Sequence, residues 1–136
     1  MKYSTLLTMA TCFLMGCGTA DDGHQSISGQ VTWNGEPISD GKISLMTAAG
    51  VTDAGDITNG VFTLRTTPGE KKVIVTAEKP AGFSRQEERV PEPEPVFYQY
   101  IPANYNTKTE LKEQVEATTE TLTFNLEGKE IKPPKK

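Results

Sequence analysis

Residues 27–38 read Ile-Ser-Gly-Gln-Val-Thr-Trp-Asn-Gly-Glu-Pro-Ile, and their pattern indicates the fold class. Its large apolar residues, with one glycine, occupy every second position up to the tryptophan, a period that places them on one face of an extended chain. The two residues that follow, Asn34 and Gly35, accept positive φ and form the tight turns of β-hairpins. We therefore expect a strand with one buried face, followed directly by a turn.

Further strands are expected along the rest of the chain. The β-branched residues Val, Ile and Thr account for 33 of the 136 residues, a composition that favours strands over helices. Further strands are expected at residues 43–47, near Asp56-Ile57, and at residues 62–65, 73–77, 111–115 and 121–126. Six or seven short strands separated by turn residues indicate an all-β, antiparallel sandwich or barrel.

Composition and charge exclude several classes of function. The chain has 14 Lys and Arg against 18 Asp and Glu, a net charge of −4, so it lacks the excess of basic residues that neutralises nucleic-acid phosphates. Its length fits a single domain. The one histidine, His24, lies before the predicted domain and is expected to be part of a spacer. Serines without a histidine to activate them are poor nucleophiles, so we expect no catalytic residues and no cofactor.

The N-terminal segment resembles the signal peptide of a bacterial lipoprotein. Met1-Lys2 starts it with a positive charge, and the apolar stretch that follows is too short to cross a bilayer. Leu14-Met15-Gly16-Cys17 resembles a lipobox, in which a small residue precedes the cysteine that receives the lipid. The alternative is an ordinary secretory signal that is cleaved near residues 18–20. We favour a signal peptide over residues 1–16 and lipidation of Cys17, which would attach the mature chain to a membrane.

Three segments are expected after the signal peptide, and the second contains a long loop. Residues 17–25 comprise the lipidated cysteine and a flexible polar tether, and residues 26–127 form the β-sandwich domain. Within the domain, residues 79–100 contain four prolines and several glutamates and are expected to form a long surface loop. Residues 128–136 contain four lysines and one glutamate and are expected to be a disordered basic tail. Cys12 is lost with the signal peptide, so no disulfide is expected in the mature chain.

A series of turn and strand motifs runs through residues 26–127 in a characteristic order. The motifs are Gly29-Gln30-Val31-Thr32, Asn34-Gly35-Glu36-Pro37-Ile38, Gly41-Lys42-Ile43, Thr52-Asp53-Ala54-Gly55, Gly60-Val61-Phe62-Thr63-Leu64 and Pro68-Gly69-Glu70-Lys71-Lys72-Val73-Ile74-Val75. Together they resemble the carboxypeptidase regulatory-like domain, and the later motifs at residues 101–106 and 122–126 resemble a subgroup of small bacterial envelope lipoproteins built on it. The resemblance implies a seven-stranded, antiparallel Greek-key sandwich of the transthyretin type, and a non-catalytic accessory or adhesion-like module.

Oxygen-bearing side chains gather in the segment at residues 52–60. Asp53, Asp56 and Asn59 could place oxygens around a hard cation such as Ca²⁺. Their spacing does not match an EF-hand, and Asp and Asn are also the usual residues of turns. We favour turn formation and keep the calcium site as the alternative.

An aromatic cluster follows the proline-rich segment. Tyr98, Tyr100 and Tyr105, together with Phe97, are the candidate ligand contacts, because aromatic rings on loops stack on sugars and anchor protein contacts. The other interpretation, which we favour, is that these rings close the open end of a thin core. Trp33 falls on the apolar face of its predicted strand and is expected in the core.

These observations favour a non-catalytic, membrane-anchored lipoprotein of the bacterial cell envelope that faces the periplasm or the cell exterior. We expect a monomer whose sandwich domain contacts an envelope protein or a glycan, and which binds no nucleic acid. The alternative is a carbohydrate- or calcium-binding periplasmic module that uses residues 53–59 or the aromatic cluster at residues 97–105.

Overall fold

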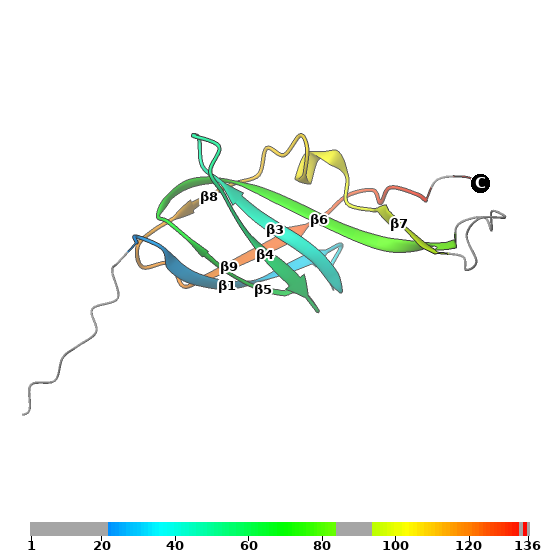
Figure 1. The fold of residues 1–136 in the computed structure, drawn as a ribbon, viewed down its shortest axis with the longest axis horizontal. Coiled ribbons are helices and arrows are strands. Elements are labelled where there is room, and N and C mark those ends of the chain that lie inside the picture. The colour runs from blue at the N-terminus through cyan, green and yellow to red at the C-terminus, as the bar shows by residue number, and fades with distance from the viewer. Residues whose placement is uncertain (1–21, 84–93, 134, 136) are drawn as a thin grey trace, which may run out of the picture.

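The computed structural model describes residues 22–83, 94–133 and 135, and this part of the chain is built almost entirely from strands (Figure 1). The all-β, antiparallel fold class predicted from the sequence is confirmed. The elements are β1 Gln25–Trp33, β2 Glu36–Pro37, β3 Asp40–Met46, β4 Thr52–Thr58, β5 Val61–Thr66, β6 Gly69–Phe83, β7 Pro95–Gln99, the 3₁₀ turn η1 Ala103–Tyr105, β8 Lys112–Val115 and β9 Thr121–Leu126. Within these ranges, no helix has the length and apolarity needed to cross a membrane. The predicted signal peptide, residues 1–16, and Cys17 lie outside the described residues.

The strands form one sheet that curls into a half-barrel (Figure 1). Seven of them follow the order β2-β1-β5-β4-β3-β6-β7, while β9 pairs with β1 and β8 pairs with β6. Neighbouring strands run antiparallel except β1 and β9, which are parallel. The described residues form nine strands, where six or seven were expected. The count rises because a two-residue strand, β2, follows the first turn and because β7 lies in a segment that was predicted to be a loop.

Two tight turns with positive φ connect neighbouring strands. Asn34 and Gly35 have φ values of 50° and 86° and join β1 to β2, which confirms the predicted turn. Asn59 and Gly60 have φ values of 51° and 78° and join β4 to β5 in the same way. Asn59 therefore serves turn formation, the interpretation that we favoured for it.

Strand β4 is longer than the short strand expected near Asp56-Ile57. It pairs with β3 along its whole length, from the Thr52–Met46 pair to the Thr58–Asp40 pair. Aspartate and glycine have low strand propensity, so the full length of β4 could not be predicted from its residue types. The segment takes its extended conformation from the pairing with β3.

The expected surface loop at residues 79–100 is partly a two-stranded β-ribbon. Strand β6 continues into this segment, and β7 returns beside it. The register shifts between Pro80 and Gly82, and Pro95 is the first residue of β7. Proline is tolerated at a bulge and at a strand start, so these prolines do not end the pairing, and the prediction of a loop is wrong at both ends. The central residues 84–93 lie outside the described residues.

One hydrophobic core fills the inside of the curl. Its buried strand residues include Ile27, Val31, Ile43, Leu45, Ile57, Phe62, Leu64, Val73, Val75, Val115, Leu122, Phe124 and Leu126. The rings of Phe62 on β5 and Phe124 on β9 stack with their centroids 6.2 Å apart. Trp33 is 6% exposed and belongs to the same core, as predicted.

Gly29 allows other chain segments to approach β1 closely. It pairs with Phe62 on β5 and with Leu122 on β9. A Cβ atom at position 29 would lie 2.6 Å from the Phe62 ring and nearer still to the carbonyl oxygen of Leu122. A glycine is required here because any side chain would displace the ring and the neighbouring strand.

Truncation of Phe124 should destabilise the domain strongly. The Phe124→Ala variant loses the stacking with Phe62 and leaves a cavity in a thin core, which costs about 3–5 kcal/mol of the roughly 5–15 kcal/mol typical of a domain. Urea unfolding of the variant and of wild type measures the difference. The control is Phe83→Ala, since Phe83 is 64% exposed and its loss should change stability by no more than about 0.5 kcal/mol. Equal stability of Phe124→Ala and wild type would contradict the packing of β9.

Candidate functional site

The predicted calcium ligands do not converge on one point. Asp53 and Asp56 are three residues apart on β4, so their side chains point to opposite faces of the sheet. The Thr66 hydroxyl donates a 2.7 Å hydrogen bond to Asp53, whereas the Asp56 side chain is 82% exposed. In the described part of the chain, no three His, Cys, Asp or Glu side chains are placed to hold a metal ion. Asp53 and Asp56 are therefore not brought together, and Asn59 lies in the turn between β4 and β5.

Two of the three candidate tyrosines are packed into the domain. Tyr100 is 5% exposed and meets Trp33 edge to face, with the ring centroids 6.4 Å apart. Tyr105 is half-buried, meets Trp33 at 6.0 Å, and donates a 2.9 Å hydrogen bond from its hydroxyl to the carbonyl of Glu127. Burial raises the pKa of Tyr100. Packing, the favoured interpretation, accounts for both residues, and Tyr100 presents no free face to a ligand.

The C-terminal segment docks on the ribbon, although disorder was expected. The Glu130 carboxylate lies 2.9 Å from the Nζ of Lys79 and accepts a 3.3 Å hydrogen bond from the Tyr98 hydroxyl. The N–H of Ile131 donates to the carbonyl of Tyr100 at 3.0 Å. The hydrogen bond to Glu130 raises the pKa of Lys79, whose Nζ lies 4.2 Å from the centre of the Tyr100 ring. The expected disorder therefore does not extend to Glu130 and Ile131.

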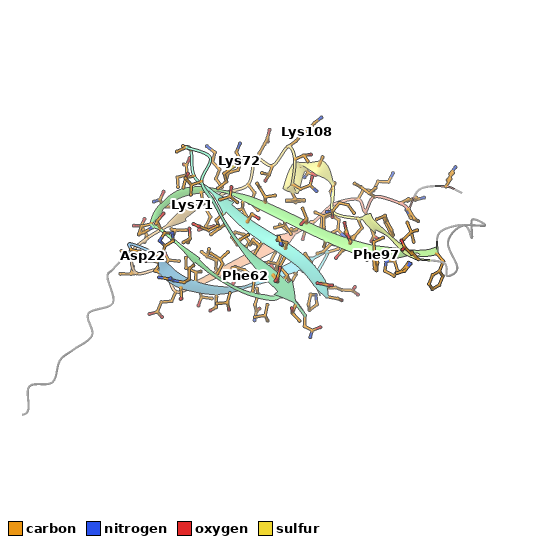
Figure 2. All side chains as sticks on the ribbon, viewed as in Figure 1. Asp22, Phe62, Lys71, Lys72, Phe97 and Lys108 are labelled. Carbon is orange, nitrogen blue, oxygen red and sulfur yellow. The ribbon has the colours of Figure 1, made fainter. Side chains whose placement is uncertain are left out.

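The ribbon of β6 and β7 exposes apolar side chains near its tip. Phe83 is 64% exposed, Phe97 is 55% exposed and Val96 is 38% exposed. Tyr98, the third candidate tyrosine, points to the opposite face of β7 from Phe97 and contacts Glu130. Phe97 is therefore the member of the aromatic cluster that is open to solvent (Figure 2).

A shallow pocket of about 390 Å³ lies beside Phe97 on the outer face of the sheet. Its lining residues are Asp40, Gly41, Lys42, Asp56, Thr76, Ala77, Glu78 and Phe97. Lys42 on β3 lies opposite Asp56 on β4 and opposite Thr76 on β6, so these three form a row across the sheet. The Nζ of Lys42 is 3.8 Å from the Asp56 carboxylate. Three carboxylates and one ammonium group thus share a pocket with an exposed aromatic ring.

A second pocket of about 520 Å³ continues along the same face. Its lining residues are Met46, Lys72, Ile74, Thr76, Asn106, Thr107, Lys108, Thr109 and Glu110. Met46 and Ile74 are half-buried, whereas Lys72 and Lys108 are exposed (Figure 2). Thr76 lines both pockets, so the two are adjacent on the outer face of the sheet. Sequence reasoning missed this surface because its residues gather only through the pairing of β3 with β6 and the return of the chain after η1.

A small polar cluster surrounds the start of β1. The N–H of His24 donates a 3.0 Å hydrogen bond to the Asp22 carboxylate, and the Nη2 of Arg65 lies 3.0 Å from the same carboxylate. The hydrogen bond from His24, with the charge of Arg65, lowers the pKa of Asp22. The Nε2 of His24 lies 3.9 Å from Asp53. His24, predicted to be a spacer residue, is thus held at the beginning of the domain.

Comparison of the chain with protein-family models finds no match, and comparison with curated proteins finds none either. Among solved structures, the chain is similar to a 9R-lipoxygenase from Cyanothece, with 11% sequence identity and a TM-score of 0.33. The match covers 91% of this chain and 18% of the lipoxygenase chain, so this chain spans less than a fifth of that protein. A likeness at this level assigns neither a family nor an activity.

Stability should fall in alkaline solution through Tyr100 and Lys79. The pKa of each is raised in the folded protein, which therefore binds these protons more tightly than the unfolded chain. Their contribution is complete below the unfolded-state pKa values, near pH 10, and is lost as the pH rises through the folded-state values. The Tyr100→Phe variant cannot ionise at this position, so urea unfolding should show a shallower loss of stability above about pH 10. Equal slopes for the variant and wild type would contradict this role of Tyr100.

Proposed function

We propose that this chain is a bacterial envelope lipoprotein, attached to a membrane through a lipid on Cys17, whose domain is a non-catalytic interaction module. The observation that carries the proposal is the separation of the two ends of the domain. Asp22, the first described residue after most of the predicted tether, lies at one end, and the ribbon that bears Phe97 lies at the opposite end (Figures 1 and 2). A domain held by its N-terminal side would present the ribbon away from the membrane, toward partners in the envelope.

The sequence before the domain supports the anchor. Leu14-Met15-Gly16-Cys17 resembles a lipobox, and Cys17 is the one cysteine that remains after removal of residues 1–16. The chain from Cys17 to Asp22 spans at most about 18 Å when fully extended. A tether of this length keeps the N-terminal end of the domain close to the bilayer surface.

The exposed side chains of the ribbon support the interaction role. Phe83, Val96 and Phe97 are exposed on neighbouring strands of one ribbon, with Val96 and Phe97 on opposite faces of β7, and exposed large apolar side chains favour a contact role for the ribbon tip. The only histidine in the sequence, His24, lines neither pocket and lies beside Asp22 and Asp53 at the other end of the domain. These features favour binding over catalysis.

We extend the proposal to the fold family. The curled sheet is interpreted as the transthyretin-like, Greek-key sandwich that the sequence resemblance implies, with domain boundaries at residues 26–127. The contribution of β1, β3, β5, β6 and β9 to one core supports this interpretation, since the two sides of a sandwich share one interior.

Replacement of the predicted lipidated cysteine tests the anchor. Metabolic labelling with an alkyne fatty acid should mark the wild-type protein and should fail for Cys17→Ala, which lacks the thiol that forms the thioether. The control is Cys12→Ala, which should leave the labelling unchanged because Cys12 lies within the predicted signal peptide. Intact-mass analysis should give a mature wild-type chain that begins at Cys17 with attached acyl groups. A chain that begins beyond residue 17 without fatty acid would overturn the anchor.

Site-specific crosslinking tests the interaction role of the ribbon. A photoreactive amino acid in place of Phe97, introduced in intact cells, should crosslink an envelope protein or glycan. The same amino acid in place of Val51 is the control, because Val51 is similarly exposed, at 59%, in the loop between β3 and β4. Crosslinks that are no more frequent at position 97 than at position 51 would contradict the proposed role of the ribbon.

A further inference from the structure

The outer face of β6 carries a positive charge at Lys72 and a negative charge at Glu78 in the part that lines the two pockets. The residues that point outward alternate along the strand and include Glu70, Lys72, Ile74, Thr76 and Glu78, of which Glu70 lies outside both pockets and is paired with Lys112 at 3.3 Å. Lys72 lines the larger pocket, Glu78 lines the smaller one, and Thr76 lines both. The two pockets are therefore adjacent along β6, one lined by Lys72 and Lys108 with Glu110, the other by three carboxylates with Lys42, and the surface that they line together is called the groove.

The acidic end of the groove is suited to an organic cation. Gly41 on β3 pairs with Ala77 on β6. Asp40 and Glu78 are the next residues beyond this pair, so they are neighbours across the sheet. Like charges in this arrangement destabilise a sheet, and a bound cation relieves the repulsion. In the described ranges no three acidic side chains are placed to hold a metal ion. The exposed ring of Phe97 in the same pocket is a favourable partner for a guanidinium or ammonium group.

The basic end of the groove is suited to a carboxylate. Lys72 and Lys108 line the same pocket with a single acidic residue, Glu110. Neither lysine forms an ion pair with any residue that the structure describes. The half-buried side chains of Met46 and Ile74 lie in the same pocket and offer an apolar surface between the charges.

The length of the groove fits a short extended chain. Lys72 and Glu78 are six residues apart on β6, which corresponds to about 20 Å at the 3.3 Å rise of a strand. An extended peptide covers the same distance with about six residues of its own. A peptide that is basic at one end and acidic at the other therefore matches both the length and the charges of the groove.

We propose that the groove binds an extended peptide segment of a partner protein, with a basic residue against Glu78 and Phe97 and an acidic residue about six positions away against Lys72 and Lys108. Uncharged residues between them lie over Met46 and Ile74. The inference rests on the proposed function as an interaction module, and it names the chemistry of the partner. Binding in the groove does not require the lipid on Cys17.

Fluorescence anisotropy with the full-length protein in detergent tests the proposal. The probe is a fluorescein-labelled octapeptide with two arginines at one end, two glutamates at the other, and four valine and threonine residues between them. The comparison probe has the same composition, with one arginine and one glutamate at each end. The first probe should bind saturably, and the comparison probe should bind at least tenfold more weakly, because neither of its ends carries a net charge to complement the groove.

Variants of the groove assign the binding site. Glu78→Gln and the double variant Lys72→Ala/Lys108→Ala should each weaken binding of the first probe by about three- to tenfold, as expected for exposed charge pairs. The matched controls are Glu36→Gln on β2 and Lys129→Ala in the C-terminal segment, which are exposed and lie outside both pockets. They should bind the probe as wild type does. Thermal unfolding of each variant shows that the fold is intact.

Three outcomes would overturn the proposal. The first is equal binding of the two probes, and the second is unchanged affinity in both groove variants. The third is self-association of the protein that the groove variants abolish, which would assign the surface to a second copy of this chain. The titration does not depend on the anchor. If the probe does not bind but Cys17 is acylated, the peptide-binding proposal is contradicted and the proposal of a lipid anchor still stands.

Discussion

The close approach of Phe62 to the backbone at Gly29 is the contact on which the curl of the sheet depends. A chain with few large apolar residues can enclose a core only if its sheet bends back on itself. At Gly29 the absence of a side chain lets the Phe62 ring enter the space beside β1 and stack on Phe124 from β9. Gly55 on β4 has a related role, because a Cβ atom there would lie 2.6 Å from the carbonyl oxygen of Thr63 on β5. The absence of side chains at Gly29 and Gly55 thus allows the close strand approaches around the core, which the apolar side chains fill.

The alternation of side chains along β6 divides the ribbon into a closed face and an open face. Lys79 points to the same side as Tyr98, and the docked C-terminal segment covers this side through Glu130. Glu78 and Phe97 point to the other side and line the acidic pocket. A single long strand therefore supports the packing of the C-terminal segment and carries the groove at the same time.

The groove and the start of the domain are placed differently relative to the proposed anchor. Asp22 and His24 form polar contacts at the end where the chain enters the domain, while the ribbon extends from the opposite end (Figure 1). Lys72 and Glu78 lie along the strand that connects these regions. A partner peptide in the groove would therefore lie along the length of the domain, with its basic residue toward the ribbon.

The fold class, the first turn and the strands with one apolar face can be predicted from the amino-acid sequence, because their signals are local. The period of two at residues 27–33 and 121–126 and the Asn34-Gly35 pair need no knowledge of distant residues. The remaining features depend on tertiary contacts. Pairing with β3 made a strand of the Asp- and Gly-containing β4 and sent Asp53 and Asp56 to opposite faces, and pairing with β7 carried β6 past Pro80. Burial of Tyr100, exposure of Phe97 and assembly of the groove depend on which strands are neighbours and in which register, and that information is not local.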